Sequence, residues 1–186
     1  CGSKIEALLD WERERESFDA GARALLDGQL QEELGDQEAG RIRGLVADRI
    51  RTSPEFARAL DVALGRAAEA LVVDAPEDAV TIGRWLKAGE IGQARLIVPD
   101  GLNRGTCEPA IPELPIDLRD YVHGLLLEHV EVDTDLVPVA HLMLCDCILV
   151  TDLQAALELT EELPGWRLVT PEGDLVDSTG VVTGHR

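Results

Sequence analysis

The sequence contains few aromatic residues: three tryptophans, two phenylalanines and one tyrosine among 186 residues. Proteins that bind single-stranded nucleic acid stack the bases on aromatic side chains, so we expect no such platform here. Basic residues are also scarce, with 17 lysines and arginines against 36 acidic residues and a formal net charge of −19. This charge disfavours non-specific binding to nucleic acid by the chain as a whole.

Long apolar stretches and disulfide patterns are missing as well. No run of about 20 apolar residues and no secretory signal is present, so we expect a cytoplasmic protein without a membrane span. The four cysteines, at positions 1, 107, 145 and 147, do not form a disulfide framework and are expected to be reduced thiols. Cys1-Gly2-Ser3 resembles a cloning remnant and is left out of the fold prediction.

The motifs of common enzymes are absent. The sequence has no G-x-x-x-x-G-K-[ST] phosphate loop, no G-x-G-x-x-G, no G-x-S-x-G and no H-E-x-x-H. Acidic pairs such as Glu161-Glu162 and Asp133/Asp135 are typical of a solvated acidic surface. We therefore predict no catalytic residues, no cofactor and no enzymatic activity.

One cluster has zinc-ligand residue types, His141-x3-Cys145-x-Cys147. A structural zinc site needs four ligands, usually with a C-x2–4-C spacing. The apolar neighbours on both sides favour buried thiols that pack as small hydrophobic groups. We therefore predict no metal site.

A strand–helix unit occurs twice in the chain. A predicted strand at residues 71–73 is followed by a helix that opens near Pro76 and by the segment R-L-I-V-P-D-G at 95–101. A second strand at 148–150 is followed by a helix and by R-L-V-T-P-E-G at 167–173. The repeat predicts an α/β (α+β) fold with two related lobes, each a small mixed sheet covered by helices.

The lobes are expected at residues 17–108 and 121–186. Prolines at 109, 112 and 115 exclude a helix or a central strand, so residues 109–120 are the predicted linker. Within the first lobe, the clearest helix should start at Ser53-Pro54 and end at Gly65. Its predicted buried face comprises Phe56, Ala59, Leu60, Ala63 and Leu64.

Both ends of the chain leave alternatives open. Residues 4–16 favour a charged helix with one apolar heptad, which fits a solvated helix or the end of a coiled coil. Near the other end, an extended segment would place Gly180, Val182 and Gly184 on one face. This segment is either a loose hairpin or an edge strand that accepts a strand from another chain.

Arginines are concentrated in one part of this acidic sequence. Residues 40–66 hold six arginines, at 41, 43, 49, 51, 58 and 66, against acids at 48, 55 and 61. These arginines either balance the acidic surface or form a basic patch.

Taken together, these segments resemble the hinge domain of SMC proteins, the chromosome-organising ATPases, in a bacterial condensin-type member. The resemblance runs from about Asp19 to Gly184. It is carried by residues 44–50, 56–65 and 71–73 in the first lobe, and by residues 148–153, 169–173 and 180–184 in the second. It implies that two chains pair head to tail into a ring-shaped homodimer. It also implies that residues 1–16 end with the stub of a coiled-coil arm leading to ATPase heads absent here.

The resemblance also implies site residues and partners. The expected dimer interface consists of Thr179, Gly180, Val181, Val182, Thr183 and Gly184. Thr179 and His185 stand where the family commonly has glycine. Weak DNA contact is expected through Arg41, Arg43, Arg49 and Arg51. For the full-length protein the resemblance implies nucleoid association and kleisin-type partners. The alternative function is a small α/β enzyme or ligand-binding domain with a pocket at the duplicated turns.

Overall fold

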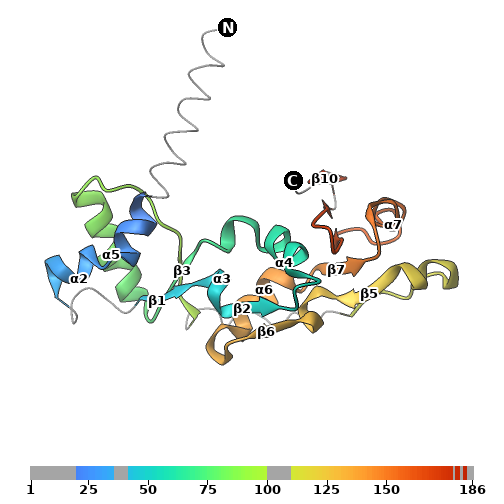
Figure 1. Cartoon of the computed structure of the whole chain (residues 1–186), viewed down its shortest axis with the longest axis horizontal. Helices are drawn as coiled ribbons and strands as arrows, with labels where there is room; N and C mark the ends of the chain where they lie inside the picture. Colours follow the sequence, from blue (N-terminus) through green and yellow to red (C-terminus); the bar gives the residue numbers. More distant parts are fainter. Residues whose placement is uncertain (1–19, 36–41, 100–109, 178, 181, 184–186) are drawn as a thin grey trace, which may run out of the picture. The chain divides into compact units, whose positions relative to one another are not determined.

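The computed structural model describes residues 20–35, 42–99, 110–177, 179–180 and 182–183 (Figure 1). The chain divides into two compact units. The first consists of Cys1–Val46 and Glu69–Leu102, and the second of Ala47–Ala68 and Asn103–Arg186. Residues 47–68 precede the predicted linker in the sequence but belong to the second unit. The predicted lobe boundaries therefore describe the sequence repeat, and the compact units follow a different division.

The first unit contains a three-stranded sheet in the order β1-β3-β4. Strand β1 (Ile42–Leu45) is antiparallel to β3 (Leu71–Val73), and β3 is parallel to β4 (Leu96–Ile97). Helix α5 (Pro76–Ala88) connects β3 to β4 and buries Ile82, Trp85 and Leu86 in the core of this unit.

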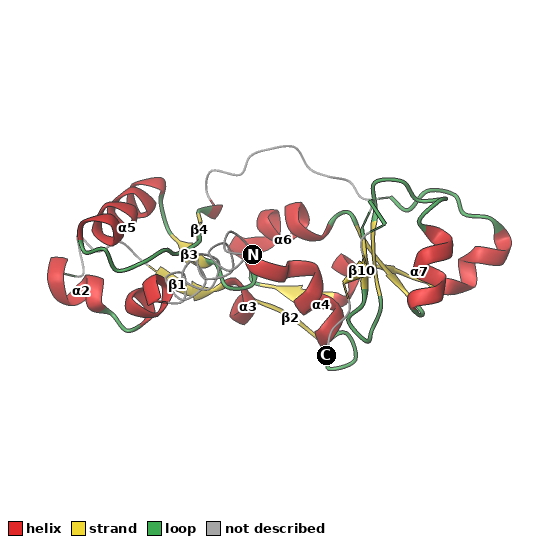
Figure 2. Cartoon of the chain, turned by 90° about the horizontal axis from the view of Figure 1, so that it is seen from above, coloured by secondary structure: helices red, strands yellow, loops and turns green. Residues whose placement is uncertain are grey.

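Side-chain hydrogen bonds fix the start of α5 and join this helix to a neighbouring helix. Helix α5 opens at Pro76 as predicted, and the Asp78 carboxylate accepts a hydrogen bond of 3.1 Å from the backbone N–H of Ala75. Helix α2 (Gln29–Leu34) lies beside α5 (Figure 2), where Trp85 Nε1 donates to Glu33 Oε2 at 2.7 Å.

The second unit contains a five-stranded sheet in the order β10-β9-β8-β7-β5. Strand β7 (Cys147–Val150) is completely buried and parallel to β8 (Arg167–Val169). Helix α7 (Leu153–Leu159) connects them, and its N-cap Asp152 accepts a 2.9 Å hydrogen bond from the Ala155 N–H. The other strands, β5 (Val122–Leu125), β9 (Leu175–Val176) and β10 (Val182–Thr183), pair antiparallel with their neighbours.

These two sheets confirm the strand–helix repeat. In each, a helix joins two parallel strands, as β3-α5-β4 and β7-α7-β8. In each, the first parallel strand also pairs with an antiparallel strand, β1 or β5, whose register shifts at a glycine. These glycines, Gly44 and Gly124, have φ of +98° and +122°, a conformation that other residues rarely adopt.

The remaining elements of the second unit come from two stretches of the sequence, one between β1 and β3 and the other between β4 and β7. They begin with α3 (Val46–Arg49), of which all but Val46 belongs to this unit, and continue with β2 (Ile50–Thr52), α4 (Ala57–Leu64) and η1 (Gly65–Ala67). After the linker come η3 (Ile116–Tyr121), η4 (Leu126–His129), β6 (Val130–Val132), η5 (Thr134–Leu136) and α6 (Val137–Leu144). Strands β2 and β6 form a separate two-stranded sheet.

Helix α4 begins later than the sequence predicts. The predicted start at Ser53-Pro54 is wrong, because residues 53–56 form a turn in which the Phe56 N–H donates to the Ser53 carbonyl at 3.0 Å. Phe56 is the N-cap and packs edge-on against His129, with ring centroids 4.9 Å apart. The other predicted core residues of this helix, 59, 60, 63 and 64, are buried.

Among the described residues, the helices are all too short or too polar to span a bilayer.

Candidate functional site

Strand β10 lies at the margin of the five-stranded sheet. In the described part of the chain it pairs only with β9, through Val182↔Val176 and Thr183↔Leu175. Val182 is 44% exposed. Of the other predicted interface residues, Thr179, Gly180 and Thr183 are exposed, whereas Val181 and Gly184 lie outside the described residues.

A polar turn leads into β10. Asp177 Oδ1 accepts hydrogen bonds from the Thr179 backbone N–H at 2.8 Å and from Thr179 Oγ1 at 2.6 Å. The Gly180 N–H donates to the Asp177 carbonyl at 2.9 Å, and Gly180 has a φ of +78°. An aspartate that bonds the backbone two residues later is a common turn former. Sequence reasoning missed Asp177, although an Asp-x-Thr-Gly segment carries this signal.

The duplicated Pro-(Asp/Glu)-Gly segment of the second unit builds the turn between β8 and β9. The buried Thr170 donates its N–H to the Asp174 carbonyl at 2.9 Å, and its carbonyl accepts from the Gly173 N–H at 3.0 Å. Thr170 Oγ1 also accepts a 3.0 Å bond from the Asp174 N–H. These bonds hold β9 against β8 and so support β10 from within the unit.

Strand β4 is the corresponding margin of the first unit. It pairs with β3 through Leu71↔Leu96 and Val72↔Ile97, and both of its residues are half-buried. In the repeat, β4 is equivalent to β8. Strand β8 has β9 on its outer side, whereas residues 20–35 and 42–99 place no strand outside β4.

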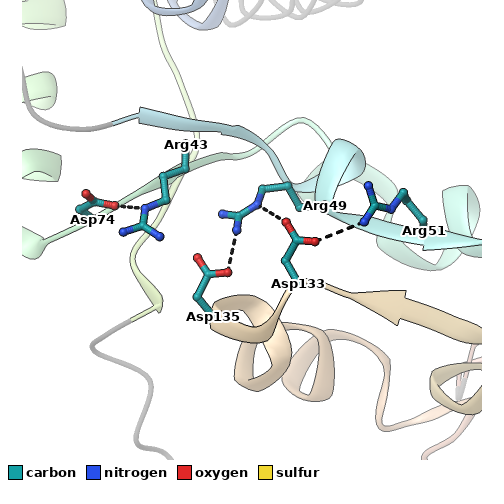
Figure 3. Close-up of polar contacts among 6 residues, drawn as sticks. All are labelled: Arg43, Arg49, Arg51, Asp74, Asp133 and Asp135. Atoms are coloured by element: carbon teal, nitrogen blue, oxygen red, sulfur yellow. Dashed lines mark hydrogen bonds and ion pairs between the residues drawn. The ribbon is translucent and has the colours of Figure 1, made fainter.

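The candidate DNA-binding arginines are engaged with carboxylates (Figure 3). In the first unit Arg43 pairs with Asp74. In the second unit Arg49 Nε donates to Asp133 Oδ2 at 2.9 Å and its Nη2 to Asp135 Oδ1 at 2.6 Å. Arg51 Nη2 donates to Asp133 Oδ1 at 3.3 Å. Arg41 lies outside the described residues.

Arg49 differs from the other arginines by its burial. Its side chain is 14% exposed, against 50% for Arg43 and 61% for Arg51. Burial lowers the pKa of Arg49, but its hydrogen bonds to Asp133 and Asp135 outweigh this effect and leave the pKa raised. A phosphate would have to compete with two carboxylates for Arg49.

The cysteine cluster does not form a metal site among the residues that the structure describes. No group of three or more His, Cys, Asp and Glu residues there could hold an ion. Cys147 is buried in β7, as predicted, and this burial raises the pKa of its thiol to about 12. Cys145 is half-buried at the end of α6, and Cys107 lies outside the described residues.

Two open cavities do not involve the duplicated turns. One of about 340 Å³ lies between residues 111–114 and 122–124. Another of about 250 Å³ lies between β2 and α4. Neither is lined by residues 98–99 or 170–173, so these cavities do not support the alternative of a ligand pocket at those turns.

Residues 39–160 match the family model described as the flexible hinge domain of SMC proteins. The chain belongs to the SMC hinge domain family.

Relatives of this hinge domain are proteins named chromosome partition protein Smc. The Myxococcus xanthus protein is 29% identical over 188 residues, which cover 98% of this chain and 15% of the relative. The Mycobacterium tuberculosis protein is 30% identical over 190 residues, which cover 97% of this chain and 15% of the relative. The chain thus spans about one seventh of the length of these relatives.

Solved hinge structures share the fold. The Geobacillus stearothermophilus SMC hinge domain, described as an asymmetric dimer, has a TM-score of 0.68 at 25% identity and covers 100% of this chain and 71% of that chain. The Pyrococcus furiosus SMC hinge domain has a TM-score of 0.60 at 23% identity, with 93% and 90% covered. The predicted hinge fold and family are therefore confirmed.

Arg167 is a structural residue of this hinge domain that sequence reasoning missed. Its Nε and Nη2 donate to Asp146 Oδ2 and Oδ1 at 2.9 and 2.5 Å. Its Nη1 donates to the Ala63 carbonyl at 2.9 Å, and Nη2 also reaches the Met143 carbonyl. Burial lowers the pKa of Arg167, but the bonds to Asp146 leave it raised overall. One guanidinium thus ties β8 to the ends of α4 and α6.

We predict that Arg167→Ala lowers the free energy of unfolding by about 3 kcal/mol, because it strips two helix-end carbonyls and a carboxylate of a charged donor. Arg167→Lys should recover only part of the loss, since lysine cannot form the paired bonds to Asp146. Urea denaturation measures both changes. Arg58→Ala, at an exposed position on α4, serves as the control. An Arg167→Ala midpoint equal to that of the control would contradict the assignment.

Proposed function

We propose that this hinge domain is a non-enzymatic dimerisation module that joins two SMC subunits by pairing of edge strands. The observation that supports this most is β10, a two-residue strand at the sheet margin with an exposed valine. A strand with one neighbour presents backbone N–H and C=O groups on its other side, and these groups need partners. A strand from a second chain provides them, and contact with Val182 adds apolar burial.

The partner strand in this proposal is β4 of the second chain. The repeat supports the choice, because β4 is equivalent to β8, and β8 has a further strand on its outer side. Pairing β10 of one chain with β4 of the other is heterologous. A two-fold axis produces two such contacts, which close a ring without leaving an unused interface.

The proposal extends to the full-length protein. We propose that it is a chromosome-organising ATPase whose heads, kleisin-type partners and nucleoid association depend on segments outside this chain. Residues 1–16 would contain the stub of the incoming coiled-coil arm. The sequence lobes at 17–108 and 121–186, with the linker at 109–120, would be the two pseudo-repeated halves of the hinge.

We predict that Gly180→Glu combined with Gly184→Glu yields monomers, because added bulk and charge keep the two edges apart. Sedimentation velocity or light scattering measures the mass in solution. The matched control is Gly165→Glu, which places the same side chain at another exposed glycine with positive φ, +90° against +78° at Gly180. A dimer that survives the double substitution would refute the interface, provided the control is also dimeric.

We propose, second, that the hinge contacts DNA weakly through exposed arginines. Arg43 and Arg51 support this because half or more of each side chain is exposed despite its ion pair. Carboxylate partners compete with phosphate, so the affinity should be low.

Any DNA affinity should fall steeply with added salt, because each phosphate contact releases condensed counterions. Changing Arg41, Arg43 and Arg51 to Ala should weaken binding and reduce the slope of log K against log salt by about 1 for each lost contact. The control changes Arg23, Arg84 and Lys87 to Ala, which removes the same charge at exposed positions of the first unit. Fluorescence anisotropy with a DNA duplex measures the affinity and its salt dependence for the wild type and for both triple variants. Equal loss in the two triple variants would remove these arginines from the account.

A further inference from the structure

The two-stranded sheet of the second unit is short. Strands β2 and β6 pair through Ile50↔Val132, Arg51↔Glu131 and Thr52↔Val130, and no other described strand joins them. A two-stranded pair of this length is at best marginally stable without additional contacts. Additional contacts come from the buried side chain of Ile50 and from side chains at the two ends of the pair.

One end is held by charged groups. The Asp133 N–H donates to the Arg49 carbonyl at 3.2 Å, which continues the pairing by one residue beyond Ile50↔Val132. At this end of the sheet, the Asp133 carboxylate accepts hydrogen bonds from both Arg49 and Arg51, and the Asp135 carboxylate accepts one from Arg49. Figure 3 shows Arg49 between the two carboxylates, which come from the segment that follows β6.

The other end is held by a hydrogen bond and a ring contact, without an ion pair between the residues involved. Thr52 Oγ1 donates to the His129 carbonyl at 2.6 Å, and the Phe56 ring packs against the His129 ring. Added salt leaves these contacts largely unaffected, because they involve no pair of opposite charges. The sheet thus has one end that depends on ionic strength and one that does not.

The charged end of the sheet depends on its ion pairs because Arg49 is buried there. Arg49 is largely buried, and its Nη1 is a buried donor for which the described residues provide no hydrogen-bond partner. A buried cation is tolerated only while carboxylates compensate its charge. The two carboxylates are themselves 37% and 35% exposed, so salt and solvent reach them.

We infer that Arg49, Asp133 and Asp135 form a latch that controls local opening of the β2–β6 sheet. When the carboxylates are neutralised or screened, the Arg49 cation favours leaving its buried position, and this end of the sheet opens. The five-stranded sheet stays closed, because its strand β7 is completely buried and pairs with β8 on one side and β5 on the other. The latch goes beyond the proposed dimerisation, since neither β4 nor β10 takes part in it.

Amide hydrogen exchange at pH 7, followed by NMR or mass spectrometry, tests the latch. Asp133→Asn with Asp135→Asn should accelerate exchange in residues 50–52 and 130–132 about tenfold, while β7 and β8 stay within about twofold. Sodium chloride at about 1 M should accelerate the same amides in the wild type and have little further effect in the variant. Asp74→Asn is the control, because it removes the ion pair of Arg43 in the first unit and should leave residues 50–52 unchanged.

Two results would overturn the latch. Unchanged exchange in β2 and β6 would show that the ion pairs do not hold the sheet. Equal acceleration of β2, β6, β7 and β8 would show that the pairs support the whole unit rather than a local joint. If the double variant does not fold, the salt titration of the wild type and the milder Arg51→Ala variant test the latch instead. In both experiments, exchange in β2 and β6 is compared with exchange in β7 and β8.

Discussion

Backbone hydrogen bonding at a sheet margin is the constraint on which this structure depends. Strand β10 has a neighbour on one side only in the described part of the chain, and it exposes Val182 beside that margin. Its position is nevertheless well supported from within the unit, because Thr170 and Asp177 build the turns on either side of β9. A strand held in place but lacking a second neighbour is preorganised for pairing, so the entropy cost of ordering it has already been met by folding.

In the proposed dimer, the duplicated architecture provides the complement to this margin. Both units use a strand, a helix and a parallel strand, but only the described residues of the second unit continue into additional antiparallel strands, β9 and β10. One copy of the motif thus carries extra strands, whereas residues 20–35 and 42–99 of the other copy place no strand at the equivalent position. The proposed heterologous contact between identical chains would use this difference between the two sheets.

Sequence patterns predicted the repeated motif and its helices because hydrophobic spacing and turn residues are local signals. Another local signal went unused: Ile42-Arg43-Gly44-Leu45 and Val122-His123-Gly124-Leu125 share a pattern that marks β1 and β5. The start of α4 was misplaced because Phe56 packs against His129, far away in the sequence. The carboxylates that pair with Arg43, Arg49 and Arg51 are also distant in the sequence from these arginines, and so is the Ala63 carbonyl that accepts from Arg167. These partners could therefore not be predicted from local sequence patterns. Neither composition nor periodicity carries information about such partners.

Disulfide formation between introduced thiols tests strand pairing most directly. Chains with Val182→Cys and chains with Ile97→Cys are co-expressed and oxidised, and linked peptides are identified by mass spectrometry. The heterologous contact predicts a disulfide between the two introduced thiols in the mixture, and none between identical chains when either variant is expressed alone. A link between two Val182→Cys chains, or an unlinked mixture that stays monomeric, would contradict the pairing of β10 with β4.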